Sequence, residues 1–124
     1  MTREEFESYT KDHYGILPDS PFEDDLDTMV YRHTDNKKWF ALVMRIPKKR
    51  LKLEGEEYID VVNLKCAQEI IDDLWRENGI FPAYHMNKKH WLTLALDGSC
   101  ADETVRWVLQ ISYDLTKTKI KKKK

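Results

Sequence analysis

The chain has 124 residues and a mass of 14.8 kDa, with 41% hydrophobic and 35% charged residues. This size fits one domain with a modest core and excludes a large multidomain enzyme. The 21 bases and 22 acids leave a net charge of -1. The longest purely apolar run, residues 39–44, is too short for a membrane span of about 20 residues, and the polar start lacks the apolar stretch of a secretory signal. We therefore expect a cytoplasmic protein that does not contact membranes.

The charges are segregated along the chain. Residues 1–36 carry ten acids and three bases, whereas residues 37–53 carry seven bases and no acid. The last eight residues, 117–124, add six lysines and little to bury, so we expect a single domain at residues 1–116 followed by a disordered lysine-rich tail. Without that tail the net charge is -7. Any nucleic-acid site must then be a local basic patch and not a generally basic surface.

The first predicted element is a helix. Thr2 and Glu5 have the spacing of a capping box, and Phe6 begins a series of aromatic residues at helical spacing. The helix is expected to run to about Tyr14, because Gly15 supplies the left-handed residue that ends many helices. Two prolines then favour an extended loop over the next ten residues.

Two strands follow, at residues 28–33 and 39–46, where β-branched and aromatic side chains are frequent. The turn pair Asp35-Asn36 between them predicts an antiparallel hairpin. Strict alternation in the second strand predicts one shared apolar face, made of Phe40, Leu42, Met44 and Ile46.

The second half is expected to contain a charged, mobile connection at residues 48–57, a strand at 58–64 and a core-facing helix over 67–75. A second hairpin is predicted to pair residues 84–86 with residues 91–96 across a turn at Asn87-Lys88. A last helix should begin near Asp102 and end near Thr116. Strands joined by tight turns are antiparallel, so the predicted class is α+β, a two-layer sandwich in which helices cover one face of a meandering sheet.

Lysines lie at the tips of both predicted hairpins. The first reads His33-Thr34-Asp35-Asn36-Lys37-Lys38-Trp39, and the second reads His85-Met86-Asn87-Lys88-Lys89-His90-Trp91. A lysine on a projecting tip suits contact with a phosphate, and two such tips side by side would straddle a duplex backbone. The ordinary explanation is that lysine at turns and strand edges prevents aggregation, and that the tryptophans pack in the core.

These stretches resemble the MmcQ/YjbR family. The resemblance rests on residues 31–42, on Asp60-Val61-Val62-Asn63-Leu64-Lys65-Cys66, and most specifically on residues 79–91, Gly-Ile-Phe-Pro-Ala-Tyr-His-Met-Asn-Lys-Lys-His-Trp. It implies a frataxin-like (CyaY-like) α+β fold and DNA binding through a double-wing motif. The positions to which that role carries over are Lys37, Lys38, Lys88, Lys89, Arg32 and His90. Ala67-Gln68 departs from the expected Asp-Pro, which weakens the cap of the second helix.

No common catalytic motif or glycine-rich phosphate loop occurs, so we expect a protein that is not an enzyme and needs no cofactor. Tyr84-His85 would serve acid-base chemistry only if the sheet brought Asp60 beside them. A metal site is not expected, because the spacings of the histidines and of Cys66 match no strong zinc pattern. The two cysteines, Cys66 and Cys100, are expected to be buried thiols.

The alternative function uses the acidic region instead of the lysines. A protein partner or metal ions would then bind acids of the first helix and the following loop, which are Glu4, Glu5, Glu7, Asp12, Glu23, Asp24, Asp25 and Asp27. Acids in a first helical turn are also explained by the helix dipole. The two alternatives use surface charges of opposite sign. Binding through the acidic region would survive the loss of the hairpin lysines, whereas DNA binding would not.

Overall fold

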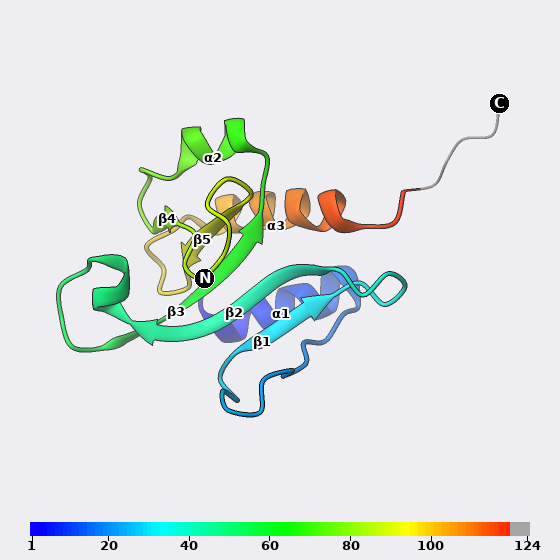
Figure 1. Cartoon of the computed structure of the whole chain (residues 1–124), viewed down its shortest axis with the longest axis horizontal. Coiled ribbons are helices and arrows are strands. Elements are labelled where there is room, and N and C mark those ends of the chain that lie inside the picture. Colours follow the sequence, from blue (N-terminus) through cyan, green and yellow to red (C-terminus); the bar gives the residue numbers. More distant parts are fainter. Residues whose placement is uncertain (120–124) are drawn as a thin grey trace.

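The computed structural model describes residues 1–119 and confirms the α+β class. Three α-helices, five strands and one short 3-10 helix follow one another along the chain (Figure 1). In order they are α1 (Arg3–Tyr14), β1 (Met29–Arg32), β2 (Trp39–Pro47), the 3-10 helix η1 (Lys48–Leu51), β3 (Tyr58–Lys65), α2 (Gln68–Leu74), β4 (Ile80–Pro82), β5 (Trp91–Ala95) and α3 (Asp102–Thr116). Of the predicted lysine-rich tail, residues 120–124 lie outside the described residues.

Helix α1 has the ends that its sequence predicts. The Thr2 hydroxyl accepts from the Glu5 backbone N–H, and the Glu5 carboxylate accepts from the Thr2 N–H at 2.8 Å, which completes the capping box. Gly15 ends the helix with φ 67°, a left-handed conformation that favours glycine. Phe6 is fully buried on the face that packs against the sheet.

All neighbouring strands are antiparallel, in the order β1-β2-β3-β5-β4. The expected meander is wrong in one detail, because β5 lies beside β3 and β4 takes the outer edge. That edge suits β4, since Pro82 has no backbone N–H and would interrupt the ladder of a central strand.

The alternation predicted for the second strand is broken at its start. Leu42, Met44 and Ile46 share one face as predicted, but Phe40 packs on the opposite, helix-covered face. The cause is a shift in the β1–β2 register, where Tyr31 pairs with Ala41 and Arg32 pairs with Trp39. Phe40 is the extra residue of this bulge, and an extra residue reverses the side on which the preceding side chains lie.

The second hairpin also differs from the prediction. Its first strand is residues 80–82, with Ile80 opposite Leu94 and Pro82 opposite Leu92. Residues 84–86 do not pair with β5 and belong to the connecting loop, 83–90. Pattern alone favoured the later residues because Pro82 reads as a strand breaker, yet an edge strand tolerates it.

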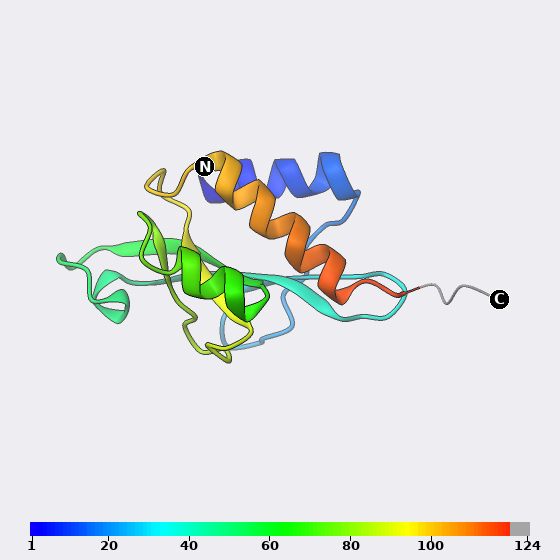
Figure 2. The same ribbon diagram turned by 90° about the horizontal axis from the view of Figure 1, so that it is seen from above.

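The two faces of the sheet are covered differently (Figure 2). Helices α1 and α3 lie across one face, and buried residues of all three helices join the larger core there, including Phe6, Leu74 and Leu109. The opposite face carries a smaller core centred on β2 and β3, against which side chains such as Trp39, Tyr84 and Leu51 of η1 pack. We call this second side the open face.

Both cysteines are buried free thiols, as predicted, and burial raises the pKa of Cys100 to about 11. Among residues 1–119, no helix is both long and apolar enough to pass through a lipid bilayer.

Candidate functional site

The two lysine-bearing loops, residues 33–38 and 83–90, lie at the same end of the sheet. Antiparallel pairing throughout makes β1 and β4 run in the same direction, so the loops that follow them leave at the same end. Strands β2 and β5, which start from these loops, are separated by β3 alone, a spacing of about 10 Å at the level of the backbone. The strand order therefore places both lysine-bearing loops at one end of the sheet, the condition under which the two tips would lie near each other.

The first loop is held against the end of α3. His33 is buried, and its Nε2 lies 2.8 Å from the Thr116 hydroxyl oxygen. That hydroxyl donates to the Ser112 carbonyl, so it accepts from the Nε2–H of His33. The Asn36 side chain donates to the Thr116 carbonyl at 2.9 Å and to the Thr118 hydroxyl at 3.2 Å. These contacts fix the base of the loop.

Lys37 and Lys38 extend from this fixed base and are exposed. Lys37 has φ 64°, and the turn closes through a bond from its N–H to the His33 carbonyl. The Asn36 side chain also accepts from the Lys38 N–H at 2.8 Å. The turn chemistry anticipated at Asp35-Asn36 therefore presents both lysines to solvent.

The second loop is built in a similar way. The Asn87 side chain accepts from the Lys89 N–H at 2.8 Å, and the Asn87 carbonyl accepts from His90 and Trp91. The Cys66 N–H donates to the His90 carbonyl at 2.9 Å, which ties the loop to the end of β3. Lys88, Lys89 and His90 are exposed.

No ion pair with a described residue engages any of the four loop lysines. Arg32, the other basic residue implied by the family resemblance, differs from them. Its guanidinium lies 2.8 Å from Asp19, whose backbone also bridges to Val30 along the outer edge of β1. Lys37, Lys38, Lys88 and Lys89 are thus free to meet an anion, whereas Arg32 already has a partner.

A buried polar pair on the open face holds the start of the second loop. Asn63 on β3 lies opposite Thr93 on β5, and both side chains are fully buried. The Thr93 hydroxyl donates to the Asn63 side-chain oxygen and accepts from the Tyr84 N–H, while the Asn63 amide donates to the Tyr84 carbonyl at 2.8 Å. Both backbone groups of Tyr84 are therefore fixed over the sheet. The next residue, His85, has φ 60°, a conformation that costs energy in a residue other than glycine.

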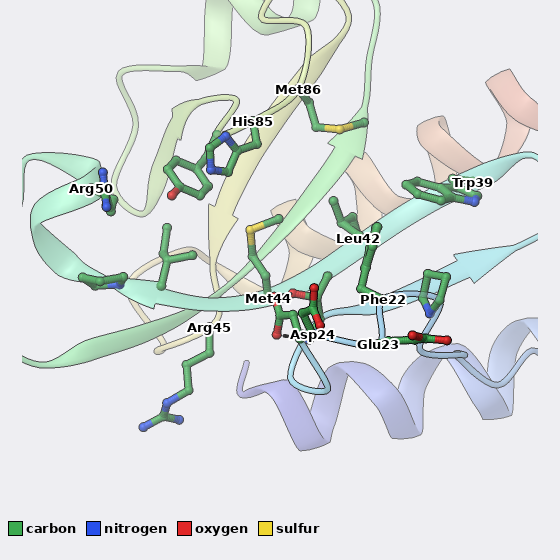
Figure 3. A pocket seen from close by; sticks show the side chains of 16 residues that line it. Phe22, Glu23, Asp24, Trp39, Leu42, Met44, Arg45, Arg50, His85 and Met86 are labelled. Carbon is green, nitrogen blue, oxygen red and sulfur yellow. Dashed lines mark hydrogen bonds between the residues drawn. The ribbon is translucent and has the colours of Figure 1, made fainter.

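A cavity of about 880 Å³ lies on the open face (Figure 3). Leu42 and Met44 of β2 line it, with Phe22 and Asp24 of the 15–28 loop on one side and His85 on the other. Phe22 meets Trp39 edge to face, with ring centroids 6.1 Å apart. The larger cavity therefore has apolar, acidic and basic walls.

A second cavity, of about 490 Å³, shares Arg50, Tyr84 and His85 with the first. It extends to the edge of the sheet, where Phe81 of β4 and Trp75 at the end of α2 also line it. Tyr84 and His85, whose ring centroids are 4.0 Å apart, thus border both cavities.

The acid-base group considered from the sequence is not assembled. Asp60 pairs with Arg3 and Arg45 at 3.5 and 3.7 Å, near the start of α1. Tyr84 and His85 lie over the open face instead. Within residues 1–119, no three or more histidine, cysteine or acidic side chains gather in a way that would hold a metal ion.

Several acids of the acidic region have local structural roles. Glu5 belongs to the capping box of α1, and Asp25 accepts from the Asp27 and Thr28 N–H groups in the loop that follows. Glu4, Glu7 and Asp12 are exposed on the same helix. These roles explain part of the acidic pattern without a partner.

Sequence reasoning missed the open-face cavities and the Asn63–Thr93 pair that positions Tyr84. One signal was available: Asn63 interrupts a run of apolar residues in a strand that reads as buried, and a buried amide needs partners. Nothing in the sequence indicated that Arg50 would line both cavities together with Tyr84 and His85, because this placement depends on how η1 packs over the sheet.

Comparisons with known proteins agree with the family resemblance. The family model described as YjbR matches residues 12–115. The chain is 38% identical to the uncharacterized protein YyaQ of Bacillus subtilis over 94% of this chain and 99% of that protein. It is 36% identical to the uncharacterized protein YjbR of Escherichia coli over 42% of this chain and 45% of that protein.

Solved structures share the fold. A crystal structure of a protein from Pseudomonas syringae superposes with a TM-score of 0.92 at 39% identity, over 94% of this chain and all 100% of that one. The Deinococcus radiodurans protein DR2400 gives a TM-score of 0.67 at 27% identity, over 92% of this chain and 77% of that one.

Proposed function

The chain belongs to the YjbR family, and we propose that it is a DNA-binding protein, not an enzyme, that contacts phosphates through its two lysine-bearing loops. The observation that supports this proposal is the position of the two loops at one end of the sheet, with four exposed lysines free of ion pairs among the described residues. Exposed lysines on fixed loops provide positive charge where a phosphate backbone can approach.

The chemistry of the loops favours backbone contact over base reading. Lysine is a flexible point charge, whereas sequence reading in the major groove most often uses arginine, asparagine or glutamine in paired hydrogen bonds. The loop asparagines, Asn36 and Asn87, are already engaged within their own turns. We therefore expect weak sequence preference and strong dependence on salt.

The test is fluorescence anisotropy of a labelled DNA duplex titrated with the protein at several salt concentrations. To remove the contribution of the terminal lysines, the chain carries serine at the four positions 121–124 and is otherwise complete. The double variant Lys88→Glu, Lys89→Glu should lose duplex binding at physiological salt. At low salt, where residual binding is measured, the slope of log affinity against log salt should be smaller in magnitude by about 2, near one unit per phosphate contact.

A matched control separates local contact from net charge. The variant Lys11→Glu, Lys49→Glu changes the charge by the same amount at two exposed lysines outside the loops. It should retain duplex binding within a few-fold. Equal losses in the two double variants would contradict the proposal, and so would full duplex affinity in the variant that lacks Lys88 and Lys89.

The acidic alternative predicts a different result. A partner bound through the acidic region, for example at Glu4, Glu7 and Asp12, would keep its affinity when Lys88 and Lys89 are reversed. The same result is expected whether the acidic region binds a protein partner or metal ions.

A further inference from the structure

We propose that the 490 Å³ cavity binds an unstacked nucleobase together with its phosphate. This inference rests on the proposed function and extends it from duplex DNA to single-stranded nucleic acid or a free nucleotide. The volume lies within the range of about 300–1,000 Å³ that is typical of small-ligand sites.

The smaller cavity has an aromatic lining. Trp75 from the end of α2, Phe81 from β4 and Tyr84 from the second loop reach the cavity from three separate segments. Aromatic faces bind bases by stacking, with little dependence on the identity of the base. Trp75 belongs to neither core and remains 38% exposed, so core packing does not account for it.

The lining of this cavity is also positively charged. The ionisable side chains that line this cavity include Arg50, Lys52, His85 and Lys88, and the described lining contains no acid. Arg76 adds a further guanidinium, 4.6 Å from the centre of the Trp75 ring. The larger cavity also contains acids, among them Asp24, and so suits an anion less well. Aromatic walls beside unopposed positive charge match a base that carries a phosphate.

One wall of the cavity is fixed before any ligand arrives. The Asn63–Thr93 pair holds both backbone groups of Tyr84, and His85 keeps its unfavourable backbone conformation beside it. Strained residues persist where the surrounding structure holds them, and they are frequent at binding sites. A preformed wall reduces the ordering that binding requires.

The cavity also continues into the proposed DNA-binding loops. Lys88 lines it and is one of the four loop lysines. A strand whose phosphates follow residues 87–89 therefore passes beside the cavity and can place a base against its aromatic lining. Bases paired in a duplex are stacked and not available to the cavity, so this site should favour single strands.

The experiment compares two tryptophan variants, Trp75→Ala and Trp107→Ala, in the full chain with serine at positions 121–124. The probes are a labelled oligothymidine of about 12 nucleotides, which is within the usual site size, and the labelled duplex. Trp107 is 50% exposed on α3 and lines neither cavity, so it is the matched control. Trp75→Ala should weaken single-strand binding at least tenfold and leave duplex affinity within twofold, whereas Trp107→Ala should change neither.

A second pair covers the case in which Trp75→Ala disturbs α2. Arg50→Glu reverses a charge in the cavity, and Lys49→Glu reverses the neighbouring charge, which lies outside it. Arg50→Glu should weaken single-strand binding at least tenfold and Lys49→Glu no more than threefold. Equal effects within each pair, or a chain that does not bind the single strand, would overturn the inference.

Competition by thymidine monophosphate identifies the source of the ligand. If thymidine monophosphate displaces the strand, and this displacement depends on Trp75, the cavity also binds free nucleotides. If strand binding depends on Trp75 but the nucleotide does not displace the strand, the cavity binds strands alone. Both results support the site. In one outcome, the Lys88→Glu, Lys89→Glu variant loses duplex binding while Trp75→Ala leaves single-strand binding unchanged. That outcome would support the proposed function and overturn this inference. Trp75-dependent strand binding without duplex binding would do the reverse.

Discussion

His33 is the residue that connects the first loop to the helix layer. Its ring is buried against Phe40 and Tyr113, with ring centroids 5.1 and 4.5 Å away, and its Nε2–H is used by Thr116. Burial is the main cause that lowers the pKa of His33, with a smaller opposing effect from the Asp35 carboxylate. A neutral imidazole is therefore part of the folded arrangement of this loop.

This pKa shift predicts an acid-sensitive stability. The unfolded chain binds a proton at His33 near pH 6.5, and the folded protein does so only at lower pH. The contribution of His33 is thus complete above pH 6.5 and is lost as the pH falls from there toward the lowered folded pKa. The urea midpoint should drop between pH 7.5 and pH 5.5, and His33→Gln should reduce that drop. His90→Gln, at an exposed loop position, is the control. An unchanged drop in His33→Gln would refute the assignment.

Thr93 carries a second prediction at the residue scale. Thr93→Val keeps the shape of the side chain but leaves the Tyr84 N–H and the Asn63 side-chain oxygen without this partner. Leaving buried polar groups unpaired costs about 1–3 kcal/mol, so the free energy of unfolding should fall by that amount. Thr93→Ser keeps the hydroxyl and should cost clearly less. Equal losses measured by urea denaturation would show that packing, and not hydrogen bonding, makes this position sensitive.

Strand β4 carries Phe81 to the smaller cavity, and its position depends on the turn before it. Gly79 in that turn has φ 75°, and its carbonyl accepts from the Ala95 N–H at 2.7 Å. A Cβ added at this position would lie 2.5 Å from the Cys100 backbone nitrogen. Gly98 also has a positive φ, 90°, but an added Cβ there meets no described atom within 4 Å.

The two glycines therefore make a matched comparison. Gly98→Ala should lower the free energy of unfolding by about 1–2 kcal/mol, which is the cost of a left-handed backbone conformation in alanine. Gly79→Ala adds a clash with backbone and should cost roughly 2–4 kcal/mol. Thermal and urea denaturation of both variants check this order, and a smaller loss at Gly79 would contradict it.

At the scale of elements, local signals predicted what depends on local chemistry. The capping box at Thr2 and Glu5, the stop at Gly15 and the end of the last helix at Thr116 are confirmed. Features set by neighbouring strands were not predictable. The bulge at Phe40 depends on the β1–β2 register, and the choice of residues 80–82 over 84–86 goes with the hydrogen bonds that Tyr84 donates to Thr93 and accepts from Asn63.

The candidate site likewise has one part that local sequence patterns predict and another that they do not. The loop lysines were recognisable because turn asparagines and adjacent lysines are local patterns, and their exposure follows from the turns. The cavities combine side chains from β2, η1, the end of α2 and the second loop, which no local pattern connects. The cavities could therefore be identified only once the packing of these segments was known.

On the scale of the whole molecule, the segregation of charge in the sequence is partly kept in space. Acids such as Glu4, Glu7 and Asp12 lie on α1, which covers one face of the sheet, whereas Arg50 and Lys88 line the smaller cavity of the opposite, open face. The larger cavity of the open face also carries acids, among them Asp24. A polyanion meeting this molecule should therefore approach the loop end and the smaller cavity and avoid α1.

The most direct test of this account is a titration of the isotope-labelled full chain, with serine at positions 121–124, against a short DNA duplex while backbone amide shifts are followed by NMR. DNA binding through the two loops predicts saturable, salt-sensitive shifts concentrated in residues 34–38 and 86–90, with little change along α1. Shifts centred on α1 and residues 23–27, or no shifts at low salt, would contradict DNA binding through the two loops.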